Sequence, residues 1–401
     1  MLNVITVAEA QALAKSVAKP VDRTCVLPLD RLPGRVAAAP VLCGEDIPAF
    51  RRSTMDGYAV ICADTFGAGE SSPAELTLVG EILMGEETPL ILSEGECAKI
   101  PTGGMLPANA DGVIPVEYTD DDGMGTCLVF RSVSPWENVV RAGDDAARGT
   151  VLFETGERFT PVSVGILAAA GVTECLVYDR PRVGILSTGN EIVPACETPA
   201  PGRVRDVNAH LLSALCAGYG CEIRRYGIIP DREDALLSAL KRAAEENDLV
   251  LLSGGSSAGD RDLTARAISA LGEVLSHGIA MKPGKPTVIG RIGGTPVFGL
   301  PGHPAACCFV TETVVAPCVE TLSGGALPIS TTEAALSENI SSNHGREEFI
   351  CVKLQNGAAV PVYGKSGVVS QLSAADGYLR VPRNSEGLQA GARVKIHLFR
   401  G

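Results

Sequence analysis

Between about residues 179 and 325 the chain alternates short apolar runs with amphipathic segments, and no other feature constrains the fold as strongly. The strand-like runs are RVGILST, EIRRYGII, DLVLLSG and PVFGL, and a helix-like pattern follows each of them. Strands and helices that alternate at this spacing form a parallel sheet with helices on both faces. The sequence therefore predicts an α/β domain with a doubly wound parallel sheet over residues 179–325.

The carboxyl ends of these strands are rich in glycine and polar residues. They are Ser187–Glu191, Pro230–Asp231, Ser253–Asp262 and Pro301–Pro304. Ligands of parallel sheets bind beyond the carboxyl ends of the strands, where these ends meet along one edge. We therefore expect the four segments to converge on one site.

Capping signals predict two helices outside this domain. Thr6 and Glu9 have the spacing of a capping box, which begins a helix over about residues 7–18. Thr160 precedes a proline and an apolar run that ends at Gly171, which predicts a second helix. We expect the two helices to pack together, so that the segment between them is an insertion.

The remaining segments differ in composition from the α/β part. Residues 46–146 are rich in glycine, proline and short β-branched runs, which predicts an inserted β-rich domain. Residues 1–45 plus 147–178 then form one helical linker domain on either side of the insertion. The β-like runs return at the end of the chain, and residues 326–401 are predicted to form a C-terminal β-barrel domain.

Composition excludes several classes of protein. The chain of 401 residues has a formal net charge of −13, so it lacks the basic surface that nucleic-acid binding requires. Its 13 cysteines are scattered without CxxC or Cys/His zinc spacing, which favours reduced thiols. The first residues do not resemble a signal peptide, and no apolar run reaches the roughly 18 residues that a membrane span needs. We therefore expect a cytoplasmic protein that binds neither nucleic acid nor membrane.

The stretch LVLLSGGSSAGDRD, residues 249–262, leaves open what the third strand end does. Gly255, Ser257 and Gly259 have the G-x-S-x-G spacing of a serine-hydrolase nucleophile elbow, and histidines follow later in the chain. The same turn is also typical of a backbone cradle for an anion, or of a plain structural turn. No Walker lysine follows, which excludes a P-loop, and no oxyanion loop precedes the stretch. The anion cradle is the preferred interpretation, and the hydrolase is the weakest.

Carboxylates lie beside this possible cradle. Asp262 would repel an anionic ligand unless a divalent cation lay between them, and Mg²⁺ bridges carboxylates and phosphates. Glu191 and Asp231 end neighbouring strands, and acids at such positions often serve only as caps or turn residues. The functional hypothesis is that Glu191, Asp231 and Asp262 form a site for Mg²⁺.

Positive charge and further acids occur in other turns. Lys282 and Lys285 each precede a proline, so they lie on a stiff turn where they could bind phosphate or another oxyanion, although surface lysines are often merely solvated. Asp56 precedes a glycine and a strand, as a plain turn acid would. By chemistry alone, the acidic and glycine-rich segments 99–117 and 138–149 are surface loops.

Several short motifs occur in a fixed order along the chain. They are Pro48-x-Phe50-x-x-Ser53-x-Met55-Asp56-Gly57, Pro101-Thr102-Gly103-Gly104-Met105-Leu106-Pro107, Arg141-x-Gly143-x-Asp145, Leu186-Ser187-Thr188-Gly189-Asn190-Glu191, Ser253-Gly254-Gly255-x-Ser257-x-Gly259-x-x-Asp262, Lys282-Pro283-Gly284-Lys285-Pro286 and Gly299-Leu300-Pro301-Gly302-x-Pro304. Each motif is weak alone. In this order, from end to end, they resemble the molybdopterin molybdenumtransferases, the family of MoeA and the gephyrin E domain.

The resemblance implies the architecture described above and an elongated homodimer, in which the inserted domain of one chain approaches the active site of its partner. It implies that adenylylated molybdopterin and molybdate are converted to molybdenum cofactor and AMP with a divalent metal, expected to be Mg²⁺. Asp56 and Asp145 would then act across the interface. Their catalytic partners would be Glu191, Asp231 and Asp262.

The resemblance also implies binding roles at matching positions. The residues expected to contact the substrate and its phosphate are Thr102, Gly254, Gly255, Ser257, Gly259, Pro301 and Gly302. Those expected to contact molybdate are Lys282, Lys285, Arg346 and Ser370. A molybdopterin adenylyltransferase and recipient molybdoenzymes are the further partners that the family suggests.

The chain departs from the family pattern at a few positions. His303 stands where many members have asparagine, and Val207 stands between Asp206 and Asn208 where serine is commoner. These departures concern substrate detail, such as molybdate against tungstate. Two other functions stay open: molybdopterin adenylyltransferase, whose core resembles residues 179–325, and a non-catalytic scaffold that retains the fold.

Overall fold

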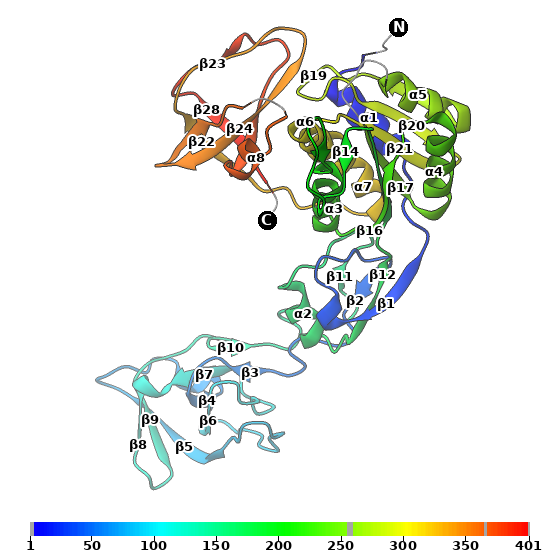
Figure 1. Ribbon diagram of the computed structural model, residues 1–401. Coiled ribbons are helices and arrows are strands. Elements are labelled where there is room, and N and C mark those ends of the chain that lie inside the picture. Colours follow the sequence, from blue (N-terminus) through cyan, green and yellow to red (C-terminus); the bar gives the residue numbers. More distant parts are fainter. Residues whose placement is uncertain (1–3, 255–259, 365–366, 400–401) are drawn as a thin grey trace.

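The computed structural model describes residues 4–254, 260–364 and 367–399, which form an elongated molecule (Figure 1). The α/β region and the C-terminal region lie at one end, joined by a short strand pairing between them. The inserted region lies at the opposite end, and the linker region connects the two ends. The chain passes through the linker region twice, before and after the insertion.

The α/β region is built on a six-stranded sheet of order β16-β13-β17-β21-β20-β18. The parallel strands are β16 (Glu222–Ile229), β13 (Arg182–Thr188), β17 (Leu249–Ser253) and β21 (Thr295–Leu300). They coincide with the four strand-like runs, so the periodicity of the sequence located them correctly.

The sheet is mixed rather than wholly parallel, which corrects the prediction. β20 (Val288–Ile292) pairs antiparallel with β21, and β18 (Glu273–His277) pairs antiparallel with β20. A two-residue turn, Gly293-Gly294, joins β20 to β21 as a hairpin. Because so short a connection can join only antiparallel strands, this hairpin ends the parallel part of the sheet.

Helices cover both faces of this sheet. On one face, Val250 and Leu252 pack against α4 (Glu233–Glu246) and α5 (Asp260–Leu271). On the other face, Leu251 belongs to a core that includes α3 (Asn208–Gly218) and the helical segment Pro304–Ser323. Alternate residues of one buried strand therefore serve two separate hydrophobic cores.

The segment Pro304–Ser323 consists of α6 (Pro304–Val310), a π turn η4 (Thr311–Val315) and α7 (Ala316–Ser323). By length and composition alone it could cross a membrane, but 78% of its apolar window is buried inside the protein. The π turn precedes Pro317, which cannot donate a backbone hydrogen bond within the helix. The apolar character of this segment is that of a core helix.

The first helix, α1 (Val7–Ser16), has the predicted capping box. The backbone N–H of Glu9 donates to Thr6 Oγ1 at 3.2 Å, and the Thr6 N–H donates to the Glu9 carboxylate at 2.7 Å. The prediction that this helix packs against the second helix, which ends near Gly171, was wrong. Val7, Ala10 and Ala14 are buried against α7 and η4 of the α/β region. A capping box fixes where a helix begins but not which surface its apolar face meets.

The linker region has its own small core. It contains the strand pair β1 (Thr24–Pro28) with β12 (Glu174–Tyr178) and the pair β2 (Val41–Leu42) with β11 (Val151–Phe153). The turn η1 (Leu29–Arg31) and the helix α2 (Ser163–Ala169) pack together beside them. Leu32, Phe159 and Leu167 are fully buried at the centre. The helix that stabilises the linker region is therefore α2, whereas α1 packs against the α/β region.

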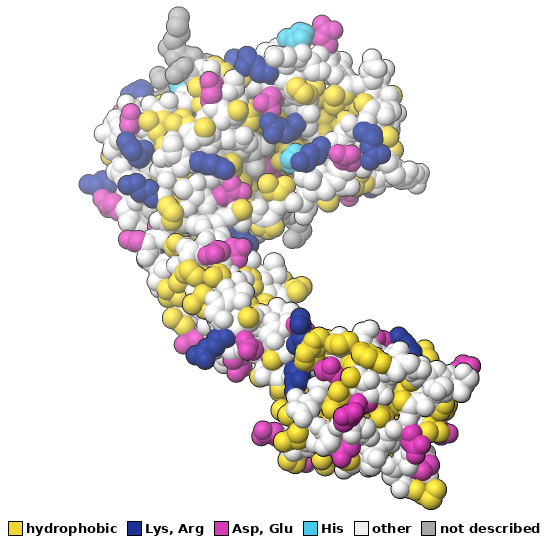
Figure 2. Space-filling view, turned by 180° about the vertical axis from the view of Figure 1, so that it is seen from behind, with side chains coloured by type: hydrophobic (Ala, Val, Ile, Leu, Met, Phe, Trp, Pro, Cys, Tyr) yellow, Lys and Arg dark blue, Asp and Glu magenta, His cyan; other side chains and the backbone are white. Residues whose placement is uncertain are grey.

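The inserted region is a six-stranded sheet of order β7-β4-β6-β5-β9-β8, together with the pair β3 and β10. The strands are β3 (Arg52–Ser53), β4 (Gly57–Val60), β5 (Ala74–Glu81), β6 (Glu96–Ile100), β7 (Gly112–Pro115), β8 (Thr119–Asp121), β9 (Thr126–Val129) and β10 (Val139–Val140). Seen from behind, hydrophobic side chains gather on this region at the end of the molecule (Figure 2). Its exposed apolar residues include Leu83, Met84 and Ile91.

The C-terminal region is a closed β-barrel. Its sheet has the order β19-β24-β25-β22-β28-β26, and β24 also pairs with β26, which closes the ring. The strands are β19 (Met281–Lys282), β22 (Thr331–Leu336), β24 (Glu347–Gln355), β25 (Ala358–Pro361), β26 (Gly377–Val381) and β28 (Arg393–Leu398), with the pair β23 (Ile340–Ser341) and β27 (Gly387–Leu388) and the short helix α8 (Ser370–Ser373) beside them. β19 comes from the α/β part of the chain, so the two regions share a strand pairing.

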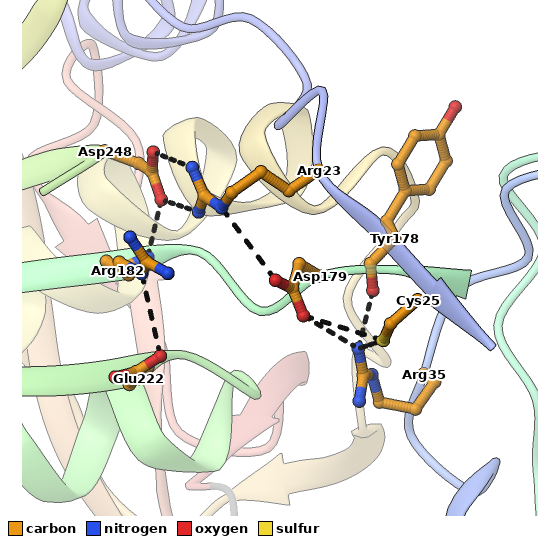
Figure 3. A network of polar contacts seen from close by, with 8 residues as sticks. All are labelled: Arg23, Cys25, Arg35, Tyr178, Asp179, Arg182, Glu222 and Asp248. Carbon is orange, nitrogen blue, oxygen red and sulfur yellow. Dashed lines mark hydrogen bonds and ion pairs between the residues drawn. The ribbon is translucent and has the colours of Figure 1, made fainter. Parts of the chain in front are cut away.

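The linker and α/β regions meet at a network of charged side chains (Figure 3). The Arg23 guanidinium donates to both oxygens of Asp248, at 3.0 and 2.6 Å. Asp248 Oδ2 also accepts from the backbone N–H of Arg182, at the start of β13, at 2.8 Å. On the linker side, Arg35 pairs with Asp179 at 3.7 Å. These contacts fasten β1 to the amino edge of the sheet, opposite the edge that carries the predicted site.

All thirteen cysteines are free, and Cys196 is the exposed one among them. Eleven are buried and Cys25 is partly buried. Burial raises the pKa of Cys221 to about 12, so this thiol stays protonated and unreactive at neutral pH. The eleven buried cysteines therefore act as small apolar core residues.

Candidate functional site at the carboxyl edge of the sheet

A cavity of about 470 Å³ opens at the carboxyl edge of the parallel strands. Its walls include Glu191 after β13, Ser253 and Gly254 at the end of β17, and Gly302 after β21. Three of the four strand ends that the sequence predicts to converge therefore share one cavity. Its volume lies in the range of small-molecule sites in proteins.

Two other parts of the chain complete this cavity. β14 (Ile192–Val193) and β15 (Val204–Arg205) pair in parallel above the end of β13, and residues of both line the wall. Gly367 and Val369 of the C-terminal region line the opposite wall. The cavity thus lies where the α/β region meets the segment that precedes α8.

Glu191 presents its carboxylate to this cavity from a turn that requires glycine. Gly189 has φ +147°, and a Cβ at this position would lie 2.9 Å from Glu191 Oε2. The Glu191 backbone carbonyl accepts from the N–H of Val204 at 2.8 Å, which holds the turn against β15. The exposed carboxylate is thus available to a ligand or a cation.

Asp231 lies at the fourth strand end, after β16, one strand beyond β13. Its carboxylate accepts from the Thr188 hydroxyl at 2.5 Å and from the Asn190 N–H at 2.9 Å. Both oxygens therefore hold the turn that carries Glu191. The structure brings Asp231 and Glu191 to one edge of the sheet, but it engages Asp231 with protein donors.

The third acid of the predicted metal triad, Asp262, belongs to α5, and its side chain lies outside the described residues. Among the residues that the structure does describe, no group of three His, Cys, Asp or Glu side chains could hold a metal ion. The triad thus stays a prediction. Gly255, Ser257 and Gly259 also lie outside the described residues, so neither the cradle nor the nucleophile-elbow interpretation of this stretch is tested.

Pro301 and Gly302 form the turn between β21 and α6. Pro301 is buried, and Gly302 lines the cavity with His303 and Pro304. The Gly302 carbonyl accepts from Asn208 Nδ2 at 2.8 Å, which fastens this turn to the start of α3. Gly254, at the end of β17, faces the same cavity.

The predicted molybdate-binding residues lie around the junction with the barrel. Lys282 Nζ forms an ion pair with Glu348 Oε1 at 2.7 Å and lines a second cavity of about 410 Å³. Lys285 is exposed on the turn after β19. Arg346 is exposed just before β24, and Ser370 is exposed at the start of α8. The structure thus places all four at the surface of this junction.

Asp56 and Thr102 are brought together in the inserted region. Asp56 Oδ1 accepts from the Thr102 N–H at 2.6 Å, and this backbone hydrogen bond lowers the pKa of Asp56 below its usual value. Asp145 is exposed, and its N–H donates to the Ile47 carbonyl at 3.0 Å. This region lies at the far end of the molecule from the cavity (Figure 1). Within one chain these residues do not share a site with Glu191.

Asp206 and Asn208 belong to the cavity wall, although the sequence analysis gave them no role in the site. Asp206 is buried, and its Oδ1 accepts from the Ala209 N–H at 3.0 Å at the start of α3. Asn208 is buried and bridges the ends of β17 and β21. An aspartate just before a predicted helix can accept a hydrogen bond from a backbone N–H of the first turn, as Asp206 does here. This signal in the sequence could have marked Asp206 as the start of a helix at the site.

Comparison with known proteins agrees with this geometry. The chain matches the MoeA N-terminal region (domain I and II) over residues 5–171, a probable molybdopterin binding domain over 184–321 and the MoeA C-terminal region (domain IV) over 333–399. A molybdopterin biosynthesis protein of Methanocaldococcus jannaschii is 35% identical over 91% of this chain and 90% of its own. The molybdopterin molybdenumtransferase of Bacillus subtilis is 31% identical over 91% of this chain and 87% of its own.

A solved structure has the same fold. The molybdopterin biosynthesis MoeA protein of Pyrococcus horikoshii superposes with a TM-score of 0.82, at 37% identity, over 100% of both chains. Family matches, relatives and fold agree along the whole length of the sequence. The chain therefore belongs to the molybdopterin molybdenumtransferases, a family of transferases of molybdenum cofactor biosynthesis.

Proposed function

We propose that this protein inserts molybdenum from molybdate into adenylylated molybdopterin and releases AMP. The observation that carries the proposal is the cavity of about 470 Å³ at the ends of β13, β17 and β21, with Glu191 in its wall. A cavity at the carboxyl edge of parallel strands, beside a glycine-rich turn, is typical of sites for phosphorylated ligands. The membership in the transferase family supports the same reaction class.

The carboxylates at this edge fit a divalent cation such as Mg²⁺. Glu191 is exposed and lines the cavity, and Asp262 lies on α5, directly after the glycine-rich sequence 254–259. Carboxylate oxygens are the ligands that Mg²⁺ prefers, and a bound cation would neutralise negative charge on the phosphates of the substrate. Asp231 would hold the turn that carries Glu191, since both its oxygens accept hydrogen bonds there.

We propose further that two chains build each site. Asp56 lies between β3 and β4, Thr102 follows β6 and Asp145 follows β10. These strands lie at the opposite end of the molecule from β13, β17 and β21 (Figure 1). The exposed Met84 lies beside Gly103, next to Thr102, so apolar surface adjoins these polar residues. In a homodimer this face would meet the cavity of the partner.

We propose that molybdate binds to the residues at the junction with the barrel, which are Lys282, Lys285, Arg346 and Ser370. The enzyme would act in the cytoplasm, where its free cysteines stay reduced.

The test is AMP release from adenylylated molybdopterin with molybdate and Mg²⁺ varied separately. We expect release to require both, and Asp262→Ala to reduce it by orders of magnitude while the melting temperature stays close to that of the wild type. Ser257→Ala is expected to cost far less. Full activity of Asp262→Ala would contradict the metal site. A complete loss in Ser257→Ala, with a covalent adduct on that serine, would support a hydrolase instead.

The shared site has its own experiment. Asp56→Ala and Asp262→Ala chains, each inactive alone, should recover part of the activity when they are mixed and exchange subunits. Recovery is expected because one of the two sites in the heterodimer then has both acids. An absence of recovery despite proven subunit exchange would show that each chain works alone.

A further inference from the structure

Asn208, the first residue of α3, has an amide group whose orientation the structure fixes. The residue lines the cavity and is 6% exposed. Nδ2 donates to Ser253 Oγ at 2.7 Å and to the Gly302 carbonyl at 2.8 Å. Because a carbonyl oxygen can only accept, the contact with Gly302 decides which end of the amide is nitrogen. The other end, Oδ1, is therefore an oriented acceptor.

In the part of the chain that the structure describes, this acceptor has no partner. Oδ1 of Asn208 is buried and, within the described residues, accepts no hydrogen bond. The hydroxyl of Ser187, which pairs with Ser253 across β13 and β17, is in the same condition. Buried polar atoms without partners destabilise a folded protein, so they occur mainly where a ligand or a water completes them.

A second asparagine shows that the fold does not require this arrangement. Asn247, which follows α4, is also 6% exposed, and its Nδ2 donates to Tyr226 Oη at 2.7 Å and to the Ala243 carbonyl at 2.8 Å. No side-chain atom of Asn247 is left buried without a partner. The unpartnered oxygen is thus a feature of Asn208 at the cavity, and Asn247 provides a matched control.

We propose that Asn208 is a substrate-binding residue whose Oδ1 accepts a hydrogen bond from the exocyclic amino group of a pyrimidine-fused ring. The proposal rests on the proposed function, because the pterin and the adenine of adenylylated molybdopterin both carry such a group. An acceptor at this place discriminates against rings that present an oxygen there, since two acceptors would then face each other. Oδ1 is buried in this structure, so the cavity wall must shift slightly when the ring enters.

The experiment compares ligands that differ only at the amino group, by calorimetric titration of the full chain. One pair is AMP and purine ribonucleoside 5′-monophosphate, which lacks the 6-amino group. The other is 6-hydroxymethylpterin and 6-hydroxymethyllumazine, in which an oxygen replaces the 2-amino group. The wild type is expected to bind the amino-bearing member of one pair about threefold to tenfold more tightly, as one neutral hydrogen bond allows. The pair that shows the preference identifies the ring at Asn208.

Asn208→Ala is expected to abolish this preference, and Asn247→Ala is expected to keep it. A merely structural clamp would weaken both members of a pair equally, and that result would overturn the proposal. So would a wild type that binds both members equally, or that binds none of the four ligands at millimolar concentration. If Asn208→Ala does not fold, the wild-type comparison alone decides. A failure of AMP release with an intact ligand preference would instead refute the proposed function and leave Asn208 as a ring-binding residue.

Discussion

The Asp231 carboxylate accepts a hydrogen bond of 2.5 Å from the Thr188 hydroxyl and so joins the carboxyl ends of β16 and β13. The other oxygen accepts from the Asn190 N–H at 2.9 Å. Glu191 follows directly and faces the cavity. The two acids at this edge therefore have different tasks: Asp231 holds the turn, and Glu191 is available to a ligand.

Replacing Thr188 by valine tests this division of labour. Thr188→Val removes the hydroxyl donor but keeps the shape of the side chain, and Asp231→Asn removes the charge. If Asp231 acts through the turn, both variants should lose about 1 to 3 kcal/mol of stability and similar fractions of activity, without a change in half-saturating Mg²⁺. Glu191→Gln should instead raise the Mg²⁺ requirement. Unfolding curves and Mg²⁺ titrations of AMP release check these outcomes.

A direct metal contact by Asp231 would give a different pattern. Asp231→Asn would then abolish activity or shift the Mg²⁺ dependence strongly, whereas Thr188→Val would leave both almost unchanged. The comparison between the two variants decides. Thr188→Val removes only the donor of one hydrogen bond, whereas Asp231→Asn removes the charge and replaces one of the two accepting oxygens by a donor.

How far the sequence predicts this structure depends on the kind of signal. Periodicity located β13, β17 and β21, because the side chains of buried parallel strands are apolar on both faces. It also located β16, an edge strand whose Ile223, Tyr226 and Ile229 are partly buried. It missed β18 and β20, since the short run at 273–277 carries Glu and His and only Gly272 separates it from the preceding helix. Capping chemistry located the start of α1 but not its partner, because packing depends on distant residues such as those of α7.

For the candidate site, too, the sequence predicted some features and not others. Strand ends with glycine and acids were correctly expected at one edge, since parallel topology brings them there. The sequence did not show which acid holds the turn and which lines the cavity. Asp231 and Glu191 look alike in the sequence, and only their hydrogen bonds and positions distinguish them. The sequence assigned Asn208 no role in the site, because its significance lies in contacts to Ser253 and Gly302, which are 45 and 94 positions away.

The junction between the linker and α/β regions predicts a mechanical effect. The hydrogen bond with Asp248 raises the pKa of Arg23, and Asp248 also accepts from Arg182 (Figure 3). Asp248→Ala would leave Arg23 without its bidentate partner in a half-buried place. We expect a loss of about 1 to 3 kcal/mol in unfolding free energy and a broader distribution of molecular dimensions in solution X-ray scattering.

An exposed ion pair provides the control for this variant. Arg393 pairs with Glu333 at 3.4 Å in the barrel, and both side chains are largely exposed. Arg393→Ala should change neither stability nor dimensions measurably, because exposed pairs contribute little. Equal effects of Asp248→Ala and Arg393→Ala would show that the junction is not held by the Arg23–Asp248 contact.

His397 predicts how the barrel responds to acid. Burial, followed by the charges of Arg380 and Lys395, lowers the pKa of His397 below its usual value of 6.5, and its ring stacks on Tyr378 at 5.2 Å. The unfolded chain therefore binds this proton more readily than the folded protein does. The stabilising effect of the neutral ring is complete above pH 6.5 and is lost as the pH falls below that value.

Melting temperatures between pH 7.5 and 5.5 check this expectation. The wild type should lose stability over this range, and His397→Gln should lose less, because it removes the titrating group. His344→Gln is the control, since that side chain is 61% exposed and is expected to change the slope little. A slope that is identical in wild type and His397→Gln would contradict the prediction.

The ion pair between Lys282 and Glu348 predicts how tightly an oxyanion binds. Lys282 Nζ lies 2.7 Å from Glu348 Oε1, and Ser342 Oγ donates to the other oxygen of Glu348 at 2.8 Å. The carboxylate offsets the charge of the lysine and would repel molybdate that approaches it. Glu348→Gln should therefore tighten molybdate binding about twofold to fivefold, the range expected from a partly exposed ion pair.

Glu347→Gln removes the same charge one residue away, where the carboxylate pairs with Arg380, so it should have a smaller effect. Weaker binding in Glu348→Gln would mean that this carboxylate holds Lys282 in place for the anion, and unchanged binding would place the molybdate site away from Lys282.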